Sequence, residues 1–433
     1  MDYTFNINVD KKILSSKSKY NFVFFGFEDK DRNLIKRFEI SELNLSHSFS
    51  FQSDVEPKWC VIWPNDGDWL TPFDISLPQV KVNKESTVTV RNYQKKILYI
   101  GQCGTSGYAN AAKGYIAKFL QDNHLVHWVP LKFDDSKDSD NYVDRLCQSA
   151  IIDNVVDTDY QEVYLHCTCD LWPQLLLKYK KNIESAKKIG VSVWETDRIP
   201  AEWINPINKM DILEVPSIFN KEIYEKDIII PIEVKPHIFH KQRLPEKVNL
   251  NFKTNNHFTY SKDKFTFYNI SEFNNRKGLF DAIKIFSDVY GDRDDVQFLI
   301  KTHFLNYKEN NIDLCLDRVC SYIKTKNIGV FVKNFTNNEL LALHSAGDCY
   351  ISLNRGEGFG LVIQEAFEYN NKVLTTGWSG HLDFLGKEYP YLIDYELEDV
   401  DMGEFNSKWY NSKQKWAKPN LDHAKELLTK IYK

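Results

Sequence analysis

Two glutamates stand eight residues apart around a glycine-rich loop. The loop reads Asn-Arg-Gly-Glu-Gly-Phe-Gly over residues 354–360, with Glu357 inside it and Glu365 on the helix that is predicted to follow. A carboxylate only accepts hydrogen bonds, so each of these groups can hold pairs of hydroxyl groups such as those of a sugar or a ribose. The pattern therefore predicts binding of a polyhydroxylated ligand. The alternative is that both carboxylates are ordinary helix-start and surface charges.

The backbone of the same loop is suited to an anion. Three glycines within residues 356–360 let a ligand come close to the main chain, because no Cβ atom intervenes. Free amides at the start of the following helix, at the positive end of its dipole, favour a phosphate. We therefore expect the amides near Gly358, Phe359, Gly360 and Leu361 to bind the phosphate part of the ligand.

A second loop brings two cations to the start of another predicted helix. Arg276 and Lys277 directly precede Gly278 and a helix predicted over residues 279–290. Two positive charges are unfavourable at the N-terminus of a helix. An anionic ligand would offset this cost, and a diphosphate is the natural candidate.

The elements around both loops alternate between strands and helices. A strand over residues 349–353, a helix over 361–369 and a strand over 372–376 form a βαβ unit, whose loop lies at the carboxyl edge of the sheet, where ligands bind. The same alternation starts near residue 97 and predicts doubly wound α/β structure. Further helices are predicted over 108–120, 143–152, 175–187, 200–209, 314–324, 339–346, 405–416 and 421–432, and further strands over 97–101, 125–129, 162–166, 191–194, 211–215, 265–270, 296–301, 330–333 and 391–393.

The first 92 residues differ from the rest of the chain. Short strands are predicted over residues 23–27, 59–63 and 87–90, separated by turn-rich segments, and helical periodicity is weak. We interpret this part as a small β-rich domain. Its tryptophans either line a carbohydrate or partner surface or, as the alternative, pack in its core.

The strings RGEGFGLVIQEA and TTGWSGHLDFL resemble the donor-binding signature of retaining glycosyltransferases of family 4, which have the GT-B fold. The resemblance implies that Glu357 is a catalytic residue near the transferred sugar and that Glu365 binds the ribose of the nucleotide. It implies that Arg276 and Lys277 bind the diphosphate and that the loop at Asn334 meets the nucleobase.

The chain departs from the family pattern at one position. The commoner pattern has an arginine five residues before the lysine, where this chain has Glu272. Either Arg276 takes over the phosphate role or the site differs.

The resemblance covers roughly residues 97–433 and implies two tandem Rossmann-like domains preceded by the β-rich region. The expected division is an accessory domain 1–92, an N-terminal acceptor domain 93–232, a linker 233–264, a C-terminal nucleotide-sugar domain 265–404, and C-terminal helices 405–433 that cross back to the N-terminal domain.

The acceptor side is predicted from loops of the first α/β domain. Gly104, Thr105 and Gly107 lie in a glycine-rich turn whose spacing is not G-x-G-x-x-G, so a dinucleotide site is not favoured, and the resemblance places this turn on the acceptor side. Polar residues that follow parallel strands tend to be functional. This makes Asp170 and Glu195 candidates for binding acceptor hydroxyls.

His166 also stands at the end of a predicted strand. It is a candidate catalytic residue, with a structural histidine as the alternative.

The implied function is a retaining hexosyltransferase that moves a sugar from a UDP- or GDP-linked donor to a hydroxyl of a glycan or other acceptor. No cofactor and no metal is expected, since the donor region lacks an Asp-x-Asp motif and the family uses Arg and Lys instead. A sugar epimerase on the same scaffold and a non-catalytic glycan-binding or scaffold protein are the alternatives.

Composition excludes several classes of protein. The net charge of -5 offers no basic surplus for nucleic acid. No apolar stretch is long enough to cross a bilayer, although peripheral membrane contact stays open, and the N-terminus lacks a signal-peptide pattern. The eight cysteines match no zinc spacing, so we expect reduced thiols and a cytoplasmic location.

Overall fold

The structure is a computed structural model. It describes residues 2–8, 23–28, 34–40, 46–52, 59–64, 73–76, 94–132, 142–242, 244, 254, 256, 258–291, 293–303, 312–401, 403 and 408–433. The chain divides into two compact units, one made of residues 1–164 with 179–187 and the other of residues 165–178 with 188–433. Each unit is described by itself.

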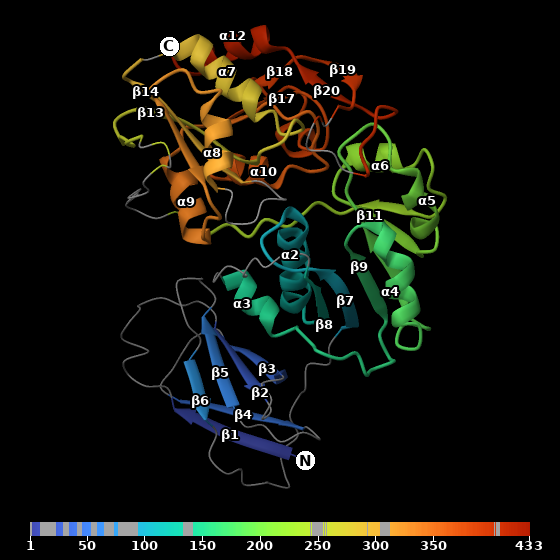
Figure 1. Ribbon diagram of the computed structural model, residues 1–433. Coiled ribbons are helices and arrows are strands. Elements are labelled where there is room, and N and C mark those ends of the chain that lie inside the picture. The colour runs from blue at the N-terminus through green and yellow to red at the C-terminus, as the bar shows by residue number, and fades with distance from the viewer. Residues whose placement is uncertain are drawn as a thin grey trace. The chain divides into compact units, whose positions relative to one another are not determined.

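The N-terminal part of the first unit consists of antiparallel strands (Figure 1, blue). Strand β1 (Asp2–Asn8) pairs with β4 (Ser46–Gln52). A four-stranded sheet has the order β3-β2-β5-β6 and is built from β2 (Val23–Glu28), β3 (Leu34–Ile40), β5 (Trp59–Pro64) and β6 (Phe73–Ser76). This confirms the β-rich interpretation. The strand predicted over 87–90 lies outside the described residues.

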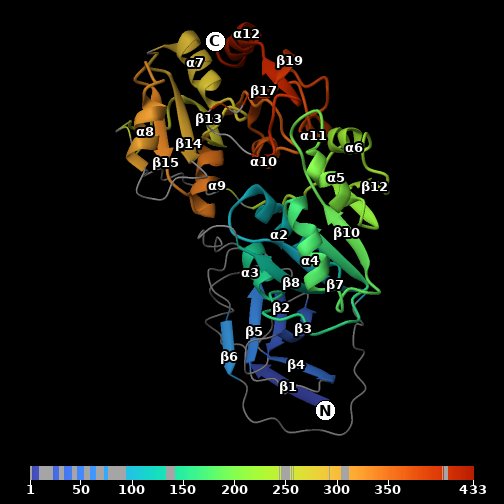
Figure 2. The same cartoon turned by 45° about the vertical axis from the view of Figure 1, so that its right-hand side comes forward.

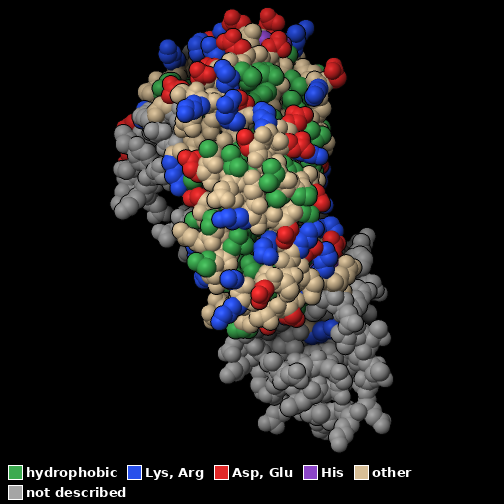
Figure 3. Space-filling view, turned by 90° about the vertical axis from the view of Figure 1, so that its right-hand side faces the viewer, with side chains coloured by type: hydrophobic (Ala, Val, Ile, Leu, Met, Phe, Trp, Pro, Cys, Tyr) green, Lys and Arg blue, Asp and Glu red, His purple; other side chains and the backbone are tan. Residues whose placement is uncertain are grey.

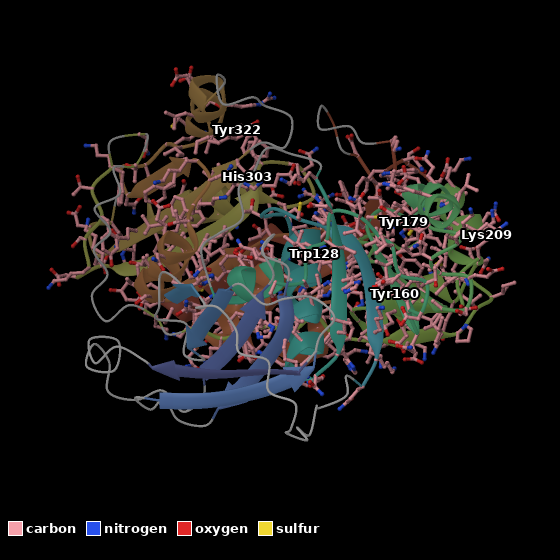
Figure 4. All side chains as sticks on the ribbon, turned by 90° about the horizontal axis from the view of Figure 1, so that it is seen from below. Trp128, Tyr160, Tyr179, Lys209, His303 and Tyr322 are labelled. Atoms are coloured by element: carbon pink, nitrogen blue, oxygen red, sulfur yellow. The ribbon has the colours of Figure 1, made fainter. Side chains whose placement is uncertain are left out.

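The α/β part of the first unit begins with two parallel strands, β7 (Lys96–Gln102) and β8 (Leu125–Leu131). Helix α2 (Gly107–Gln121) connects them, and its N-cap is Ser106, whose side chain accepts a hydrogen bond from the Ala109 amide. Trp128 of β8, labelled in Figure 4, is buried and donates its indole N–H to the Gly101 carbonyl. The short helix α3 (Tyr142–Gln148) follows.

The first six-stranded sheet has the order β12-β11-β10-β9-β7-β8. Its remaining strands are β9 (Glu162–His166), β10 (Lys187–Val191), β11 (Ile212–Val215) and β12 (Ile232–Val234). The connecting helices are η1 (Cys169–Leu171), α4 (Trp172–Lys178), α5 (Ala201–Ile207) and α6 (Ile218–Tyr224).

The helix predicted over 175–187 and the strand predicted over 191–194 are wrong. Helix α4 ends at Lys178, and β10 already begins at Lys187. The Asn182 side chain donates to two backbone carbonyls of the segment before β9, and this local bonding competes with a continued helix. Within β10, a Cβ atom on Gly190 would lie 2.4 Å from the Trp172 ring, so the glycine marks close packing of the strand against that ring rather than a helix.

The second six-stranded sheet is parallel throughout, with the order β15-β14-β13-β16-β17-β18. Helices cover both of its faces, as Figures 1 and 2 show. Its strands are β13 (Phe265–Glu272), β14 (Val296–His303), β15 (Ile328–Val332), β16 (Cys349–Ser352), β17 (Lys372–Thr376) and β18 (Leu392–Ile393). Its helices are α7 (Leu279–Tyr290), α8 (Ile312–Cys320), α9 (Asn337–Ala346), α10 (Leu361–Glu368), α11 (Leu382–Leu385) and α12 (Leu421–Ile431).

The strand order of this sheet defines a ligand-binding edge. The chain runs outward from β13 through β14 to β15, returns to β16 beside β13, and runs outward again through β17 to β18. The order reverses between β13 and β16, so the loops that follow these two strands separate at the carboxyl edge. This confirms the doubly wound interpretation, and it brings the two loops predicted to bind the ligand to the same place.

Two apolar cores lie on the two faces of this sheet. One contains buried side chains of α7 and α12 together with Phe298 and Ile300 of β14. The other contains side chains of α9 and α10 together with Leu299. Because successive side chains of a strand point to opposite faces, β14 contributes to both cores.

The helix predicted over 405–416 is wrong for the residues that the structure describes there. Residues 415–419 form β20 (Lys415–Pro419), which pairs antiparallel with β19 (Tyr395–Asp399), and residues 408–409 form a turn. The Gln414 side chain binds both the Trp409 carbonyl and the Asn411 amide, and such bonding to the backbone competes with a helix. Of the two C-terminal helices expected, only α12 is observed in the described part of the chain.

The described surface carries charges of both signs. On the face in Figure 3, acidic and basic side chains occur together. In the part of the chain that the structure describes, no helix combines the length and the apolar character that crossing a bilayer requires.

Candidate functional site

The loops after β13 and β16 meet at a glycine. Gly278 has φ +63°, and a Cβ atom there would lie 1.9 Å from the Leu353 carbonyl oxygen. Only glycine combines this backbone conformation with so close an approach. Beside it, the Arg355 amide donates to the Arg276 carbonyl at 2.7 Å, which joins the two loops directly.

The predicted donor-site residues Lys277, Arg276 and Glu357 come together across these loops. The Lys277 Nζ atom lies 2.5 Å from Glu357 Oε1, and an Arg276 guanidinium nitrogen lies 3.5 Å from Glu357 Oε2. Arg276 also donates to the Gly356 carbonyl at 2.8 Å. The sequence predicted all three residues, and the structure places them within one cluster.

Burial and charge oppose each other in this cluster. Burial alone would raise the pKa of Glu357, but the Lys277 and Arg276 cations outweigh it, so this pKa lies below its ordinary value. Burial tends to lower the pKa of Arg276. The surrounding negative groups, of which Glu195 contributes most, outweigh burial and hold this pKa above its ordinary value. The cluster therefore consists of two cations and an ionised acceptor at neutral pH.

Glu195 belongs to this cluster although it was predicted for the acceptor side. It follows β10, and its Oε1 atom lies 3.6 Å from an Arg276 guanidinium nitrogen. Its other carboxylate oxygen accepts the Tyr410 hydroxyl at 2.8 Å. The Tyr410 ring stacks on Trp194 with a centroid distance of 4.8 Å. Sequence reasoning missed Tyr410, because its segment was interpreted as a helix and no motif marks it.

The glycine loop packs against the start of α6 and against the loop that follows β17. The Gly358 carbonyl accepts a hydrogen bond from Ser217, the N-cap residue of α6, at 2.6 Å. The Glu357 amide donates to Ser379 at 2.9 Å, and the Glu357 carbonyl accepts from the Gly380 amide. The glycines therefore allow close packing of the protein itself, beside the ligand approach predicted from the sequence.

The start of α10 keeps its amides uncapped by a side chain. Gly360 is the N-cap residue and has no side chain to offer, and Leu361 opens the helix. Phe359 is buried, and its ring lies 5.4 Å from that of Phe384. The binding of an anion at this helix terminus remains a prediction.

Glu365 lies on α10 beside a buried histidine. Its Oε2 atom is 3.4 Å from His344 Nε2, and the other ring nitrogen of His344 is 2.9 Å from the Tyr268 hydroxyl. The Glu365 side chain is 31% exposed, so it stays accessible. Asn334 is exposed in the loop after β15. The ribose and nucleobase roles of these two residues remain predictions.

His166 and Asp170 lie at the carboxyl end of β9. His166 is fully buried, which holds its pKa well below the ordinary value, and its ring lies 6.4 Å from that of His237. His237 in turn contacts the Phe359 ring edge-on at 5.0 Å. Asp170 pairs with Lys408 at 3.1 Å. A catalytic role of His166 is still a prediction.

Gly104, Thr105 and Gly107 belong to the first unit. The Gly104 carbonyl accepts a hydrogen bond from the buried Lys113, Thr105 is exposed, and Gly107 begins α2. Their role on the acceptor side remains a prediction.

Lys301 and His303 at the end of β14 were missed by sequence reasoning. The signal that could have revealed them is a lysine in an otherwise apolar run that reads Val-Gln-Phe-Leu-Ile-Lys-Thr-His. Among the described residues, no group of three or more His, Cys, Asp or Glu side chains is arranged to hold a metal ion.

Comparison with solved structures identifies proteins that share the fold of this chain. No protein-family model matches the sequence, and no curated protein matches it. A solved glycosyltransferase from Rickettsia africae ESF-5 is 14% identical, with a TM-score of 0.53 over 78% of this chain and 89% of that chain. WaaG, a glycosyltransferase involved in lipopolysaccharide biosynthesis, is 11% identical, with a TM-score of 0.50 over 78% of this chain and 90% of that chain. At such identities the likeness shows the fold alone, and it confirms the predicted GT-B architecture.

Proposed function

We propose that this protein is a glycosyltransferase that moves a sugar from a nucleotide-sugar donor to a hydroxyl of an acceptor. The observation that carries the proposal is the cluster of Lys277, Arg276 and Glu357 at the ligand-binding edge of the second sheet. Cations, uncapped helix amides and an ionised carboxylate are the groups that a sugar diphosphate requires.

In this proposal the donor diphosphate binds to Arg276, Lys277 and the amides at the start of α10. These groups stabilise the negative charge that develops on the diphosphate as it leaves. Glu357 holds hydroxyls of the transferred sugar, Glu365 holds the ribose, and the loop at Asn334 meets the base.

The ion pairs of the cluster set a condition on donor binding. Lys277 and Arg276 are both paired with Glu357 in the structure. The diphosphate must take over part of these interactions, which leaves the carboxylate oxygens of Glu357 to accept from sugar hydroxyls. A charge-assisted hydrogen bond is replaced by others of the same kind, so the exchange costs little.

The proposal extends to finer points that rest on the family resemblance. These are membership of family 4, transfer with retention at the anomeric carbon, independence from metal ions, and a UDP- or GDP-linked hexose. The acceptor is a glycan or glycoconjugate. Glu195, Asp170 and His166 of the second unit are proposed to contact it, and an acceptor role for the loop at Gly104 to Gly107 of the first unit rests on the resemblance. A cytoplasmic location, expected from the sequence, is part of the same proposal.

A panel of UDP- and GDP-sugars, with and without glycan acceptors, tests the proposal through release of free nucleotide. Glu357→Gln should lower turnover by about 100-fold or more, because an interaction made at the reacting sugar is lost. Glu368→Gln, which changes an exposed glutamate at the end of α10, is the matched control and should keep normal turnover. Normal turnover of Glu357→Gln would show that Glu357 has no role in the reaction.

The same assay separates the two alternatives. A changed sugar with no released nucleotide would indicate an epimerase. Absence of any turnover across the panel would favour a glycan-binding or scaffold protein, which the presence of Glu272 in place of the family's arginine mildly supports.

A further inference from the structure

Lys301 is a buried cation at the ligand-binding edge of the second sheet. It lies near the end of β14, and only 7% of the residue is exposed. Its Nζ atom lies 3.2 Å from His303 Nδ1. Among the described residues no carboxylate forms an ion pair with Lys301. A buried ammonium group without a counter-anion is costly, so its retention calls for an explanation.

The register of β14 shows which face Lys301 and His303 occupy. Lys301 is opposite Ile270 and His303 is opposite Glu272 in the parallel pairing of β14 with β13. Side chains in register on neighbouring strands point to the same face, and Ile270 belongs to the core that α9 and α10 cover. The pair therefore lies on the face of α10, whose N-terminus is at the same edge of the sheet. His303 is labelled in Figure 4.

Lys301 and His303 together offer hydrogen-bond donors to a ligand and no free acceptor. An ammonium group only donates, so His303 must accept through Nδ1 and carry its proton on Nε2. Burial, aided by the Lys301 and Lys277 cations, lowers the pKa of His303 to about 3, so this ring is neutral at pH 7. Burial also lowers the pKa of Lys301 to about 8, which leaves it mostly charged at pH 7. A matching ligand group must supply negatively charged acceptor oxygens.

We propose that Lys301 and His303 bind a phosphate group of the nucleoside diphosphate, as a second cationic element beside Arg276 and Lys277. This deepens the proposed function and rests on it for the identity of the ligand. Strand β14 lies on the side of β13 that is opposite to β16, so Lys301 and His303 are on the other side of the Lys277 loop from the Glu357 loop, which follows β16. Arg276 and Lys277 already have Glu357 as a partner, whereas the partner of Lys301 among the residues that the structure describes is the neutral ring of His303.

Glu272 is the nearest competing explanation. It is opposite His303 in the register and is mostly buried, which raises its pKa. The Arg276 and Lys277 cations oppose this rise. Within the described ranges, Glu272 forms no ion pair with Lys301, so it does not act as the counter-anion of this lysine.

Titration calorimetry of the full chain with inorganic pyrophosphate and with UDP and GDP tests this assignment. Lys301→Met should weaken pyrophosphate and UDP binding at least tenfold, Lys301→Arg should retain most of it, and His303→Asn should weaken it less than Lys301→Met. Lys284→Met, at an exposed position on α7, is the control and should bind normally. Unchanged pyrophosphate affinity of Lys301→Met would overturn the proposal.

Thermal unfolding distinguishes this role from a structural one. Lys301→Met should unfold at a higher temperature than the wild type without ligand, because a buried charge is removed, and pyrophosphate should stabilise it less. A lower unfolding temperature together with a full pyrophosphate-induced rise would mean that Lys301 is structural, against the proposal. Neither result depends on turnover, so the Glu357→Gln assay decides the proposed function separately.

Discussion

Single residues in the second unit carry charge at a cost in stability. Lys277 and Arg276 keep Glu357 ionised in spite of its burial. Lys301 has no such compensation in the described part of the chain, where its hydrogen-bond partner is the neutral ring of His303. Residues that bind ligands are often kept although they destabilise the ligand-free protein, and Lys301 has the environment of such a residue.

The pKa of Lys301 predicts how stability depends on pH. It falls from 10.5 to about 8 on folding, so the unfolded chain binds more protons between these values and stability rises with pH across that window. The buried charge therefore costs up to about 3 kcal/mol at pH 7, at about 1.4 kcal/mol per pKa unit. Denaturant unfolding at pH 7 and pH 9.5 should show that Lys301→Met gains stability over the wild type mainly at pH 7. An equal difference at both pH values would contradict a lowered pKa.

Loops and strand ends are brought together by glycines that have no room for a side chain. A Cβ atom on Gly356 would lie 2.0 Å from the Glu195 carbonyl oxygen, and one on Gly380 would lie 2.0 Å from the Gly358 carbonyl oxygen. The atoms in the way are backbone atoms, which cannot swing aside as the end of a side chain can. The glycine spacing that resembles a ligand-binding motif is thus also a packing requirement.

Gly356→Ala should therefore lower the free energy of unfolding by at least about 2 kcal/mol, as an inserted methyl group does in a tightly packed place. Gly107→Ala is the matched control, because a Cβ atom there would meet no heavy atom within 4 Å. Denaturant titration of both variants measures the difference. Equal stability of the two would show that the loop after β16 can move away from Glu195.

At the scale of the whole molecule, the binding edge exists because the second sheet reverses its strand order between β13 and β16. Arg276 and Lys277 come from the loop on one side of this reversal, and Glu357 comes from the loop on the other side. Glu357 is about 80 positions away from Lys277 and its neighbour Arg276 in the chain, and the three residues meet only in the folded sheet.

A ligand bound at this edge should stabilise the folded chain. At a UDP concentration of 100 times its Kd, the gain is about 2.7 kcal/mol, because only the folded state has the site. The unfolding temperature of the wild type should rise with UDP, and that of Lys277→Met should rise much less at the same concentration. An equal rise in both proteins would show that the diphosphate does not bind at Lys277. The control Lys284→Met should show the same rise as the wild type.

Local pattern was enough to predict much of the fold. Helix 279–290 and the strands 162–166 and 372–376 agree with the structure to the residue, because their apolar periodicity and their flanking turn residues are local signals. The glycine loop, its two glutamates and the Arg276–Lys277 pair were also singled out from the sequence, by residue type, spacing and the family resemblance. The helices predicted over 175–187 and 405–416 failed where side chains such as Asn182 and Gln414 bind the backbone.

Tertiary structure alone decided which side chains share a site. The sequence alone determined that this chain builds doubly wound α/β structure and that one segment combines two glutamates with a glycine-rich loop. It could not place Glu195 and Tyr410 against Arg276, nor show that Lys301 is buried beside His303, since these contacts join separate elements. The physical reason is that periodicity records which face of an element is apolar, whereas the meeting of charges depends on strand order and register.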